Sequence, residues 1–222
     1  MSGFSRDYHD FVFRDGQLVA QFEEMYRYSD GVPWRQDEQE DWIDIRLTVD
    51  VVRDLGPFDE IHDLGSGLGH YLALIHRKLA RPGARGVGYD ISETACARAR
   101  ATFPEFVFQQ LDLMADTPEE SEADSRVRRL FVIRGTLWYV FPKIGNVVRT
   151  IRRRMSSDDT LLVVQNFPPL DRPFVGKDVI PNHHALITHF TSAFVLLRHL
   201  WYEDAFKAAN DNWFIGLFSV RA

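Results

Sequence analysis

Three glycines stand at every second position, at Gly65, Gly67 and Gly69, shortly after an acidic residue, Asp63, that ends a short apolar run. Glycine has no Cβ and tolerates positive φ, so such a loop can turn sharply and bring its backbone close to a ligand. Apolar residues at helical spacing follow the loop. This places free backbone N–H groups at the start of a helix, where polar ligand groups bind. The spacing therefore predicts a strand, a glycine loop and a helix that together hold a small ligand.

The residue after the last glycine separates two kinds of ligand. A dinucleotide fingerprint, G-x-G-x-x-G, needs glycine at position 70, where this chain has His70. The pattern D-x-G-x-G-x-G instead resembles the first motif of the class I S-adenosylmethionine-dependent methyltransferases. The resemblance implies S-adenosyl-L-methionine as the cofactor and assigns part of its binding site to this segment, namely Asp63, Gly65, Ser66, Gly67 and Gly69.

Acidic residues also end the next two predicted strands. The first spans residues 85–89 and leads to Asp90, and the second spans residues 106–111 and leads to Asp112. Ser92 fills the N-cap position of the helix after Asp90, so Asp90 is expected to be free to accept the two ribose hydroxyls of an adenosine. In the resembling family an acid at the third strand end lies beside the adenine amino group. The resemblance therefore assigns the adenosine half of the cofactor to Asp90, Ile91, Asp112 and Leu113.

A continuous apolar run at residues 129–134 predicts a fourth, central strand. In the resembling family the transferable methyl group meets its acceptor at the end of this strand. Arg134 and Gly135 are accordingly assigned to the cofactor, and Trp138 and Tyr139 to the acceptor. Two aromatic residues of the N-terminal region join the predicted acceptor site, although plain packing against the sheet stays open for each; they are Tyr26 and Trp34.

The predicted site residues follow four different strands, so the fold must bring the carboxyl ends of these strands to one edge of a sheet. Strand and helix signals alternate along the chain, and two apolar strands at 194–201 and 213–220 predict a closing antiparallel pair. The predicted fold class is α/β: a doubly wound, Rossmann-like seven-stranded sheet, mostly parallel with an antiparallel C-terminal strand and with helices on both faces. Residues 1–57 form a predicted helical lid region, with apolar helix faces over 18–26 and 42–52, and residues 58–222 form the methyltransferase core of a single domain.

Residues 167–191 predict a long irregular segment, and a loop of that length is a candidate functional segment. It contains three candidate catalytic histidines, His183, His184 and His189. Their offsets do not form a one-turn helical pair, and no carboxylate or cysteine cluster accompanies them, so a metal site is disfavoured. Two alternatives stay open: a general base for a hydroxyl acceptor, and loop histidines without chemistry.

The tetrapeptide Asn166-Phe167-Pro168-Pro169 resembles the Asn/Asp-Pro-Pro-aromatic motif of amino-directed DNA methyltransferases. That motif follows the fourth strand without an intervening residue, whereas this one follows the fifth and carries Phe167 after the asparagine. We therefore interpret the likeness as accidental. The net charge of −6 also argues against a nucleic-acid partner, because phosphate binding needs a basic surface.

The composition, 222 residues of which 45% are hydrophobic, indicates a compact enzyme with one substantial core. No apolar run approaches the length of a membrane span and the first residues lack a signal region, so a cytoplasmic location without membrane contact is expected. The single Cys96 excludes an internal disulfide and is predicted to be a core residue. The acidic stretch at 116–124 is predicted to be a solvated loop.

The predicted function is transfer of a methyl group from S-adenosylmethionine to an oxygen or nitrogen nucleophile of a small molecule, such as a sugar or a natural-product-like metabolite. A non-catalytic S-adenosylmethionine-binding sensor or partner subunit is the alternative, since motifs that bind a cofactor do not prove chemistry. A nicotinamide oxidoreductase is disfavoured by His70 and by Asp112. The expected partner is a small-molecule acceptor, no metal is expected, and a homodimer stays open.

Overall fold

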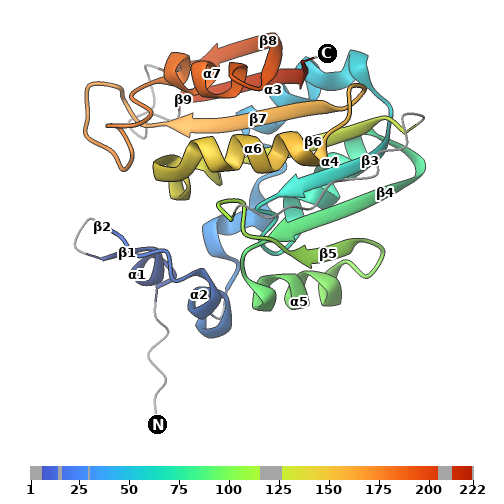
Figure 1. Ribbon diagram of the computed structural model, residues 1–222. Helices are drawn as coiled ribbons and strands as arrows, with labels where there is room; N and C mark the ends of the chain where they lie inside the picture. The colour runs from blue at the N-terminus through green and yellow to red at the C-terminus, as the bar shows by residue number, and fades with distance from the viewer. Residues whose placement is uncertain (1–6, 15–16, 30, 116–126, 205–211, 222) are drawn as a thin grey trace.

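The computed structural model describes residues 7–14, 17–29, 31–115, 127–204 and 212–221. Its centre is a seven-stranded sheet in the order β5-β4-β3-β6-β7-β9-β8 (Figure 1). The strands are β3 (Phe58–Leu64), β4 (Ala80–Asp90), β5 (Val107–Gln110), β6 (Arg129–Arg134), β7 (Thr160–Phe167), β8 (Phe194–Tyr202) and β9 (Asn212–Val220). Strands β3 to β7 are parallel, and β9 runs antiparallel between β7 and β8. The predicted α/β sheet, mostly parallel with an antiparallel C-terminal strand, is confirmed.

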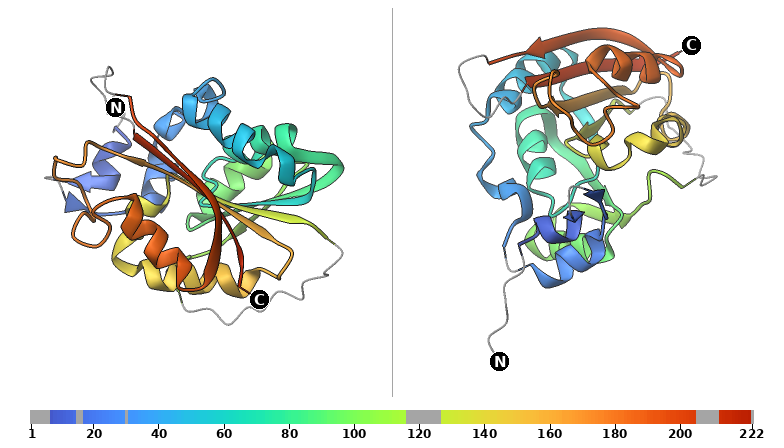
Figure 2. Two further views of the ribbon diagram at one scale, coloured as in Figure 1. Left: turned by 90° about the horizontal axis from the view of Figure 1, so that it is seen from above. Right: turned by 90° about the vertical axis from the view of Figure 1, so that its left-hand side faces the viewer.

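Helices cover both faces of this sheet, as predicted (Figure 2). One face packs against α3 (Ile43–Val52), α4 (His70–Leu79) and α5 (Glu93–Thr102), and the other against α6 (Ile144–Arg154) and α7 (His183–Thr191). The apolar residues of α4 and α6 recur every three or four positions and are buried, which is why these segments form helices against a sheet. Cys96 is buried in α5, a core position.

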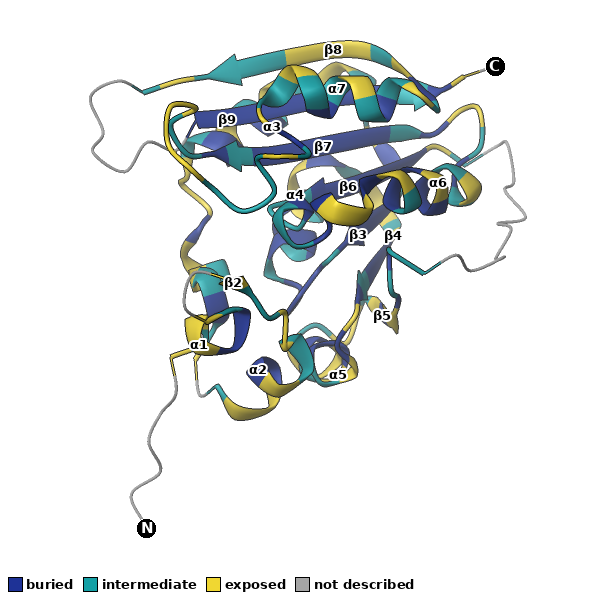
Figure 3. Cartoon of the chain, turned by 60° about the vertical axis from the view of Figure 1, so that its left-hand side comes forward, coloured by how far each residue is buried: buried dark blue, intermediate teal, exposed yellow. Residues whose placement is uncertain are grey.

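The two central strands explain where the core lies. Residues 130–133 of β6 and 161–164 of β7 are no more than 1% exposed, so both faces of each strand are covered (Figure 3). Continuous apolar runs are typical of parallel strands buried on both faces. The carboxyl ends of these strands therefore rest on a rigid base, on which a functional site can be placed.

Most of the N-terminal region lies beyond the carboxyl ends of the strands, on the side to which the arrowheads of β3 and β4 point (Figure 1). Its elements are α1 (His9–Val12), β1 (Phe13–Arg14), β2 (Gln17–Leu18), α2 (Phe22–Tyr28) and the 3-10 helix η1 (Pro33–Glu38). We call these described residues, 8–38, the lid. The lid has a small core of its own, which includes Met25 and Tyr26 and also takes in Leu68 and Ala95. The helix α3 packs on the sheet instead, through Ile45 and Val52, and a domain division at residue 57 stays a prediction.

Three predicted element bounds are wrong. The first helix begins at Phe22, because Leu18 pairs with Phe13 in a short hairpin. The strand predicted at residues 85–89 begins earlier, at Ala80, directly after α4 ends at Leu79. The segment predicted to be irregular through residue 191 contains α7. The predicted acidic loop at 116–124 lies outside the described residues.

The helix α7 forms for reasons that local spacing shows only weakly. The side chain of Asn182 accepts a hydrogen bond from the backbone N–H of Ala185, 3.1 Å away, and so caps the first turn. Leu186 and Phe190, one turn apart, are fully buried. Burial of this narrow face stabilises a helix in which most of the other residues, three of them histidines, have low helix propensity.

Two further observations concern the described residues as a set. No helix among them is both long and apolar enough to cross a membrane. No three or more His, Cys, Asp or Glu side chains in this part of the chain are grouped so as to hold a metal ion.

Candidate functional site

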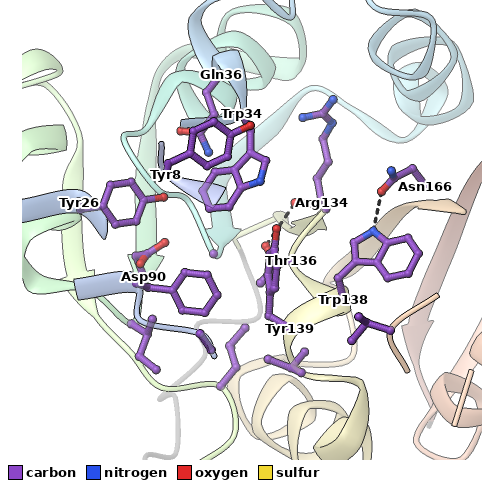
Figure 4. A pocket seen from close by; sticks show the side chains of 18 of the residues that line it. Tyr8, Tyr26, Trp34, Gln36, Asp90, Arg134, Thr136, Trp138, Tyr139 and Asn166 are labelled. Carbon is purple, nitrogen blue, oxygen red and sulfur yellow. Dashed lines mark hydrogen bonds between the residues drawn. The ribbon is translucent and has the colours of Figure 1, made fainter. Parts of the chain in front are cut away.

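A cavity of about 740 Å³ lies at the carboxyl ends of the strands, between the sheet and the lid (Figure 4). Ligand pockets span roughly 300–1,000 Å³, so a cofactor and part of a second molecule fit here. The predicted acceptor residues Tyr26, Trp34, Trp138 and Tyr139 all line the cavity. So do most of the predicted cofactor residues: Gly65, Asp90, Ile91, Asp112, Leu113, Arg134 and Gly135. Asp63, Ser66, Gly67 and Gly69 lie behind the lining.

Asp90 ends β4 with its carboxylate buried at the edge of the cavity. One oxygen accepts a hydrogen bond from the backbone N–H of Gly67 at 2.8 Å, and the other from the N–H of Ser92 at 2.9 Å. Burial raises the pKa of Asp90 to about 6, against the effect of these donors. The Ser92 side chain caps α5, as predicted. Asp90 accepts a hydrogen bond from the backbone N–H of Ser92 at the same helix start. Each carboxylate oxygen has two lone pairs, so capacity remains for ligand hydroxyls.

Asp63 and Arg134 form a second polar centre beneath the cavity. Asp63 is the second-last residue of β3, is 3% exposed, and has one carboxylate oxygen without a hydrogen-bond partner. Burial raises its pKa to about 7, although the nearby Arg134 charge works in the opposite direction. Arg134 donates from Nε to Asp44 at 2.7 Å and from Nη1 to Gln39 at 2.6 Å, while its Nη2 has no partner. Buried polar groups are nearly always paired, so this acceptor and this donor are the groups a charged ligand would satisfy.

The glycine loop is shaped by close approach of the protein's own side chains. All three glycines have positive φ, +87° at Gly65, +53° at Gly67 and +84° at Gly69. A Cβ on Gly67 would lie 2.7 Å from both the Gln36 side chain and the Tyr26 hydroxyl. Gln36 also accepts a hydrogen bond from the N–H of Leu68 at 3.2 Å. The lid therefore closes directly on the loop, and glycine at position 67 is required for that contact.

A polar latch joins the lid to α5. Glu23 of α2 accepts from the Ser92 hydroxyl at 2.6 Å and from the N–H of Thr94 at 3.2 Å, and the Ser92 and Thr94 side chains lower the pKa of Glu23 to about 2. Arg98 of α5 donates to the backbone carbonyls of Tyr26 and Gly31, at 2.8 and 3.2 Å. These hydrogen bonds hold the lid against α5, whose first turn adjoins Asp90.

Aromatic rings form the lid side of the cavity. The Trp34 and Tyr8 rings meet edge to face, with centroids 5.2 Å apart. The centroids of the Trp34 and Tyr139 rings are 5.9 Å apart (Figure 4). The backbone of Trp34 and Arg35 is left-handed, with φ of 54° and 52°, which is strained for residues with large side chains. Gln39 supports this turn by donating to the Trp34 carbonyl at 2.7 Å. Such strain is retained where surrounding contacts fix a side chain in place, here an indole over the cavity.

Asn166 is a lining residue that the sequence analysis set aside. It ends β7 beside Trp138, whose indole N–H donates to the Asn166 side-chain oxygen at 2.8 Å (Figure 4). The amide oxygen, the atom that would grip an exocyclic amine, is therefore already engaged. This contact gives Asn166 a defined place in the site, beside Trp138.

The three candidate catalytic histidines lie on α7, and none lines the cavity. His183 stacks on Trp201 with centroids 4.2 Å apart, and burial lowers its pKa. His184 and His189 follow on the same helix. The prediction that one of them is a general base has no geometric support.

Several lining residues were missed because their positions depend on contacts between distant segments. They are Tyr8, Phe13, Phe22, Gln36, Gln39, Trp42, Thr136, Met114, Asn166, Phe174 and Trp213. Asn166 had a usable signal, since a polar residue at the end of a buried parallel strand tends to face a ligand site. The lid residues in this set carried no sequence signal of a ligand site beyond the many aromatic residues in that region.

Several solved structures of similar fold are methyltransferases. The N-methyltransferase NodS from Bradyrhizobium japonicum, in complex with S-adenosyl-L-homocysteine, has a TM-score of 0.64 and 14% identity, over 90% of this chain and 99% of its own. A methyltransferase in complex with the Haloferax volcanii Trm112 methyltransferase activator has a TM-score of 0.65 and 15% identity, over 91% and 98%. A TehB-like S-adenosylmethionine-dependent methyltransferase from Corynebacterium glutamicum has a TM-score of 0.54 and 18% identity, over 78% and 87%.

Neither a family model nor a curated protein sequence matches the chain. The similarity to solved structures extends over nearly the whole chain, and the strand order with one inserted antiparallel strand agrees with the expectation from the glycine motif. The chain therefore has the fold of the class I S-adenosylmethionine-dependent methyltransferases.

Proposed function

We propose that this protein binds S-adenosylmethionine in the cavity and transfers its methyl group to an oxygen or nitrogen nucleophile of a small molecule, such as a sugar or a natural-product-like metabolite. The observation that carries the proposal is the set of acids at successive strand ends, where Asp90 and Asp112 line the cavity and Asp63 lies behind it. Asp90 and Asp112 would hold the adenosine. The unpartnered oxygen of Asp63 and the unpartnered Nη2 of Arg134 fit an amino group and a carboxylate, respectively.

The cofactor would supply an activated methyl group on its sulfonium, so the protein has to align the acceptor and exclude water. The lid does the second task, because Tyr8, Trp34 and Tyr139 close one side of the cavity with aromatic surface. The lining residues that the structure describes include no histidine, lysine or glutamate. This composition favours catalysis by positioning, and an acceptor that does not need a side-chain base of those types.

Calorimetric titration with S-adenosylhomocysteine tests the cofactor assignment. Replacing Asp90 by Asn keeps the size of the side chain but removes the charged acceptor, so affinity should fall about ten- to a hundredfold. Asp178→Asn is the matched control, because Asp178 is exposed and lies outside the cavity lining. Equal affinity in the wild-type protein and in Asp90→Asn, or no binding by the wild-type protein, would contradict the assignment.

The absence of histidine, lysine and glutamate among the described lining residues also keeps a non-catalytic binding role as the second candidate. An S-adenosylmethionine sensor or partner subunit needs the cofactor contacts but no acceptor. A mass-spectrometric assay with labelled S-adenosylmethionine and a broad panel of small acceptors separates the two. Methylated product supports the enzyme, whereas tight binding with only slow cofactor hydrolysis across the panel supports the binding role.

A further inference from the structure

Asn166 is placed to contact whatever occupies the outer part of the cavity. It stands at the end of β7, directly opposite Trp213 of β9 in the sheet register. Trp138, Phe174 and Trp213 line the cavity together with it, and the Trp138 and Phe174 rings meet edge to face with centroids 5.3 Å apart. Asn166 is thus a single polar side chain among three aromatic rings.

The orientation of the Asn166 amide is set by two donors. The indole N–H of Trp138 lies 2.8 Å from the amide oxygen, and Nε2 of Gln165 lies 3.3 Å from the same atom. An indole N–H can only donate, so the amide atom that faces it must be the oxygen. Gln165 is held in turn, because its Nε2 also donates to the Asn166 backbone carbonyl at 2.8 Å.

With its oxygen used twice, the Asn166 side chain offers only its NH₂ group. The structure shows no acceptor for Nδ2 among the described residues, and Figure 4 shows the amide beside the cavity with its oxygen toward Trp138. A ligand meeting this group must therefore present an oxygen or nitrogen lone pair. A group that can only donate, such as an ammonium, would leave both partners without a hydrogen bond, which weakens binding about tenfold or more.

The charges around the cavity argue that this lone pair belongs to an uncharged group. Of the two arginines among the described lining residues, Arg35 is paired with Glu38, and Arg134 is paired with Asp44 at 2.7 Å and keeps only the Nη2 proposed above for the cofactor's carboxylate. Asp90 and Asp112 add negative charge to the lining. An anionic ligand group would meet more carboxylates than free cations, whereas a carbonyl oxygen has no such penalty.

Accepting methyl transfer as proposed above, we propose that Asn166 selects the acceptor, and that the acceptor has a flat, apolar body with a carbonyl oxygen bound to Asn166 Nδ2. Flat aromatic ligands pack well against Trp138, Phe174 and Trp213. Trp138 is then a positioning residue, because its N–H fixes which end of the amide faces the ligand. A buried polar group of fixed orientation discriminates strongly against ligands that lack its partner.

A matched pair of fragments tests this inference without knowledge of the natural acceptor. The pair is 4-hydroxyacetophenone and 4-ethylphenol, which share ring and length but differ in the carbonyl oxygen. Each is titrated by NMR into protein labelled with ¹⁵N asparagine, with and without S-adenosylhomocysteine. We expect 4-hydroxyacetophenone, the ketone, to bind about tenfold more tightly than 4-ethylphenol and to shift the Asn166 NH₂ signals. We expect 4-ethylphenol to leave those signals in place.

Two variants sharpen the result. Asn166→Asp replaces the donor by a charged acceptor, so the tenfold preference for the ketone should vanish. Trp138→Phe keeps the ring but removes the orienting N–H, so the preference should weaken while both fragments still bind. Asn182→Asp is the control, because Asp also caps helices well and Asn182 lies on α7, outside the cavity lining.

An equal affinity for the two fragments, or a ketone preference that survives in Asn166→Asp, would overturn the role of Asn166. If Asn166→Asp fails to fold, Trp138→Phe and the Asn166 NH₂ signals of the wild-type protein still decide the matter. The fragment titration without cofactor separates the two proposals: cofactor binding can fail while the fragment preference persists, and the reverse outcome removes only the role of Asn166.

Discussion

Asp63 should lower the stability of the ligand-free protein at neutral and alkaline pH. Its carboxyl is 3% exposed, has one oxygen unpartnered, and has its pKa raised to about 7 from an ordinary value of 3.8. The folded protein therefore keeps a proton on Asp63 that the unfolded chain releases. Stability is greatest below the ordinary pKa and falls as pH rises toward 7. The loss is about 1.4 kcal/mol for each pH unit in that window.

Replacing Asp63 by Asn removes the ionisation and nearly preserves the shape. The difference in unfolding free energy between variant and wild-type protein should grow in favour of the variant by roughly 3 kcal/mol between pH 5 and pH 8. Urea unfolding at several pH values measures this difference directly. The same substitution should weaken S-adenosylhomocysteine binding, since Asp63 is proposed to face the cofactor's amino group. The variant would then be more stable and less functional.

Asp159 provides the control of opposite sign. It is 1% exposed, but it accepts hydrogen bonds from Arg129 at 2.6 and 2.9 Å. Asp159→Asn removes a charged acceptor of two hydrogen bonds from the buried Arg129 guanidinium and should destabilise the protein at neutral pH, by up to about 3–5 kcal/mol. Parallel pH profiles of wild-type protein and Asp63→Asn would refute the reasoning, because they would mean that Asp63 ionises equally easily in both states.

Three further predictions concern the lid. Glu23→Gln weakens the latch to α5, so amide hydrogen exchange in residues 22–28 should quicken about tenfold, whereas Glu24→Gln, at an exposed neighbouring position, should change nothing. Gly67→Ala puts a Cβ 2.7 Å from the Tyr26 hydroxyl and should displace the lid, seen as faster proteolysis between the lid and β3. Ser92→Ala removes the cap of α5 and a latch donor, and should cost about 1 kcal/mol in urea unfolding.

Local signals predict the frame of this molecule well. The strand at residues 129–134 has the predicted bounds, because a continuous apolar run bounded by polar residues has few alternatives in a protein of this class. The N-cap at Ser92 is also confirmed, since capping depends on residues three positions apart. The acids at strand ends could be named for the same reason: a parallel sheet brings them to one edge whatever the loops do.

Contacts between distant segments could not be predicted in this way. Arg134 pairs with Asp44, 90 positions earlier in the chain, and no local pattern marks that pairing. The lid residue Gln36 meets Leu68 only because α2 and η1 fold back over the loop. The histidines show the complementary error. The length of the segment 167–191 suggested a functional loop around them, whereas the burial of Leu186 and Phe190 places them on a helix, and none of them lines the cavity.

The position of β9 between β7 and β8 has a consequence for the order of folding. Among the strands that the structure describes, β8 pairs with β9 alone, yet β9 comes later in the chain. During synthesis, β8 must wait without a strand partner until residues 212–220 leave the ribosome, with the exposed side chains of Val195 and Leu197 beside an open edge. An unpaired strand edge of this kind is a site at which nascent chains aggregate. Chaperone demand during production should therefore be greatest for chains stalled between β8 and β9.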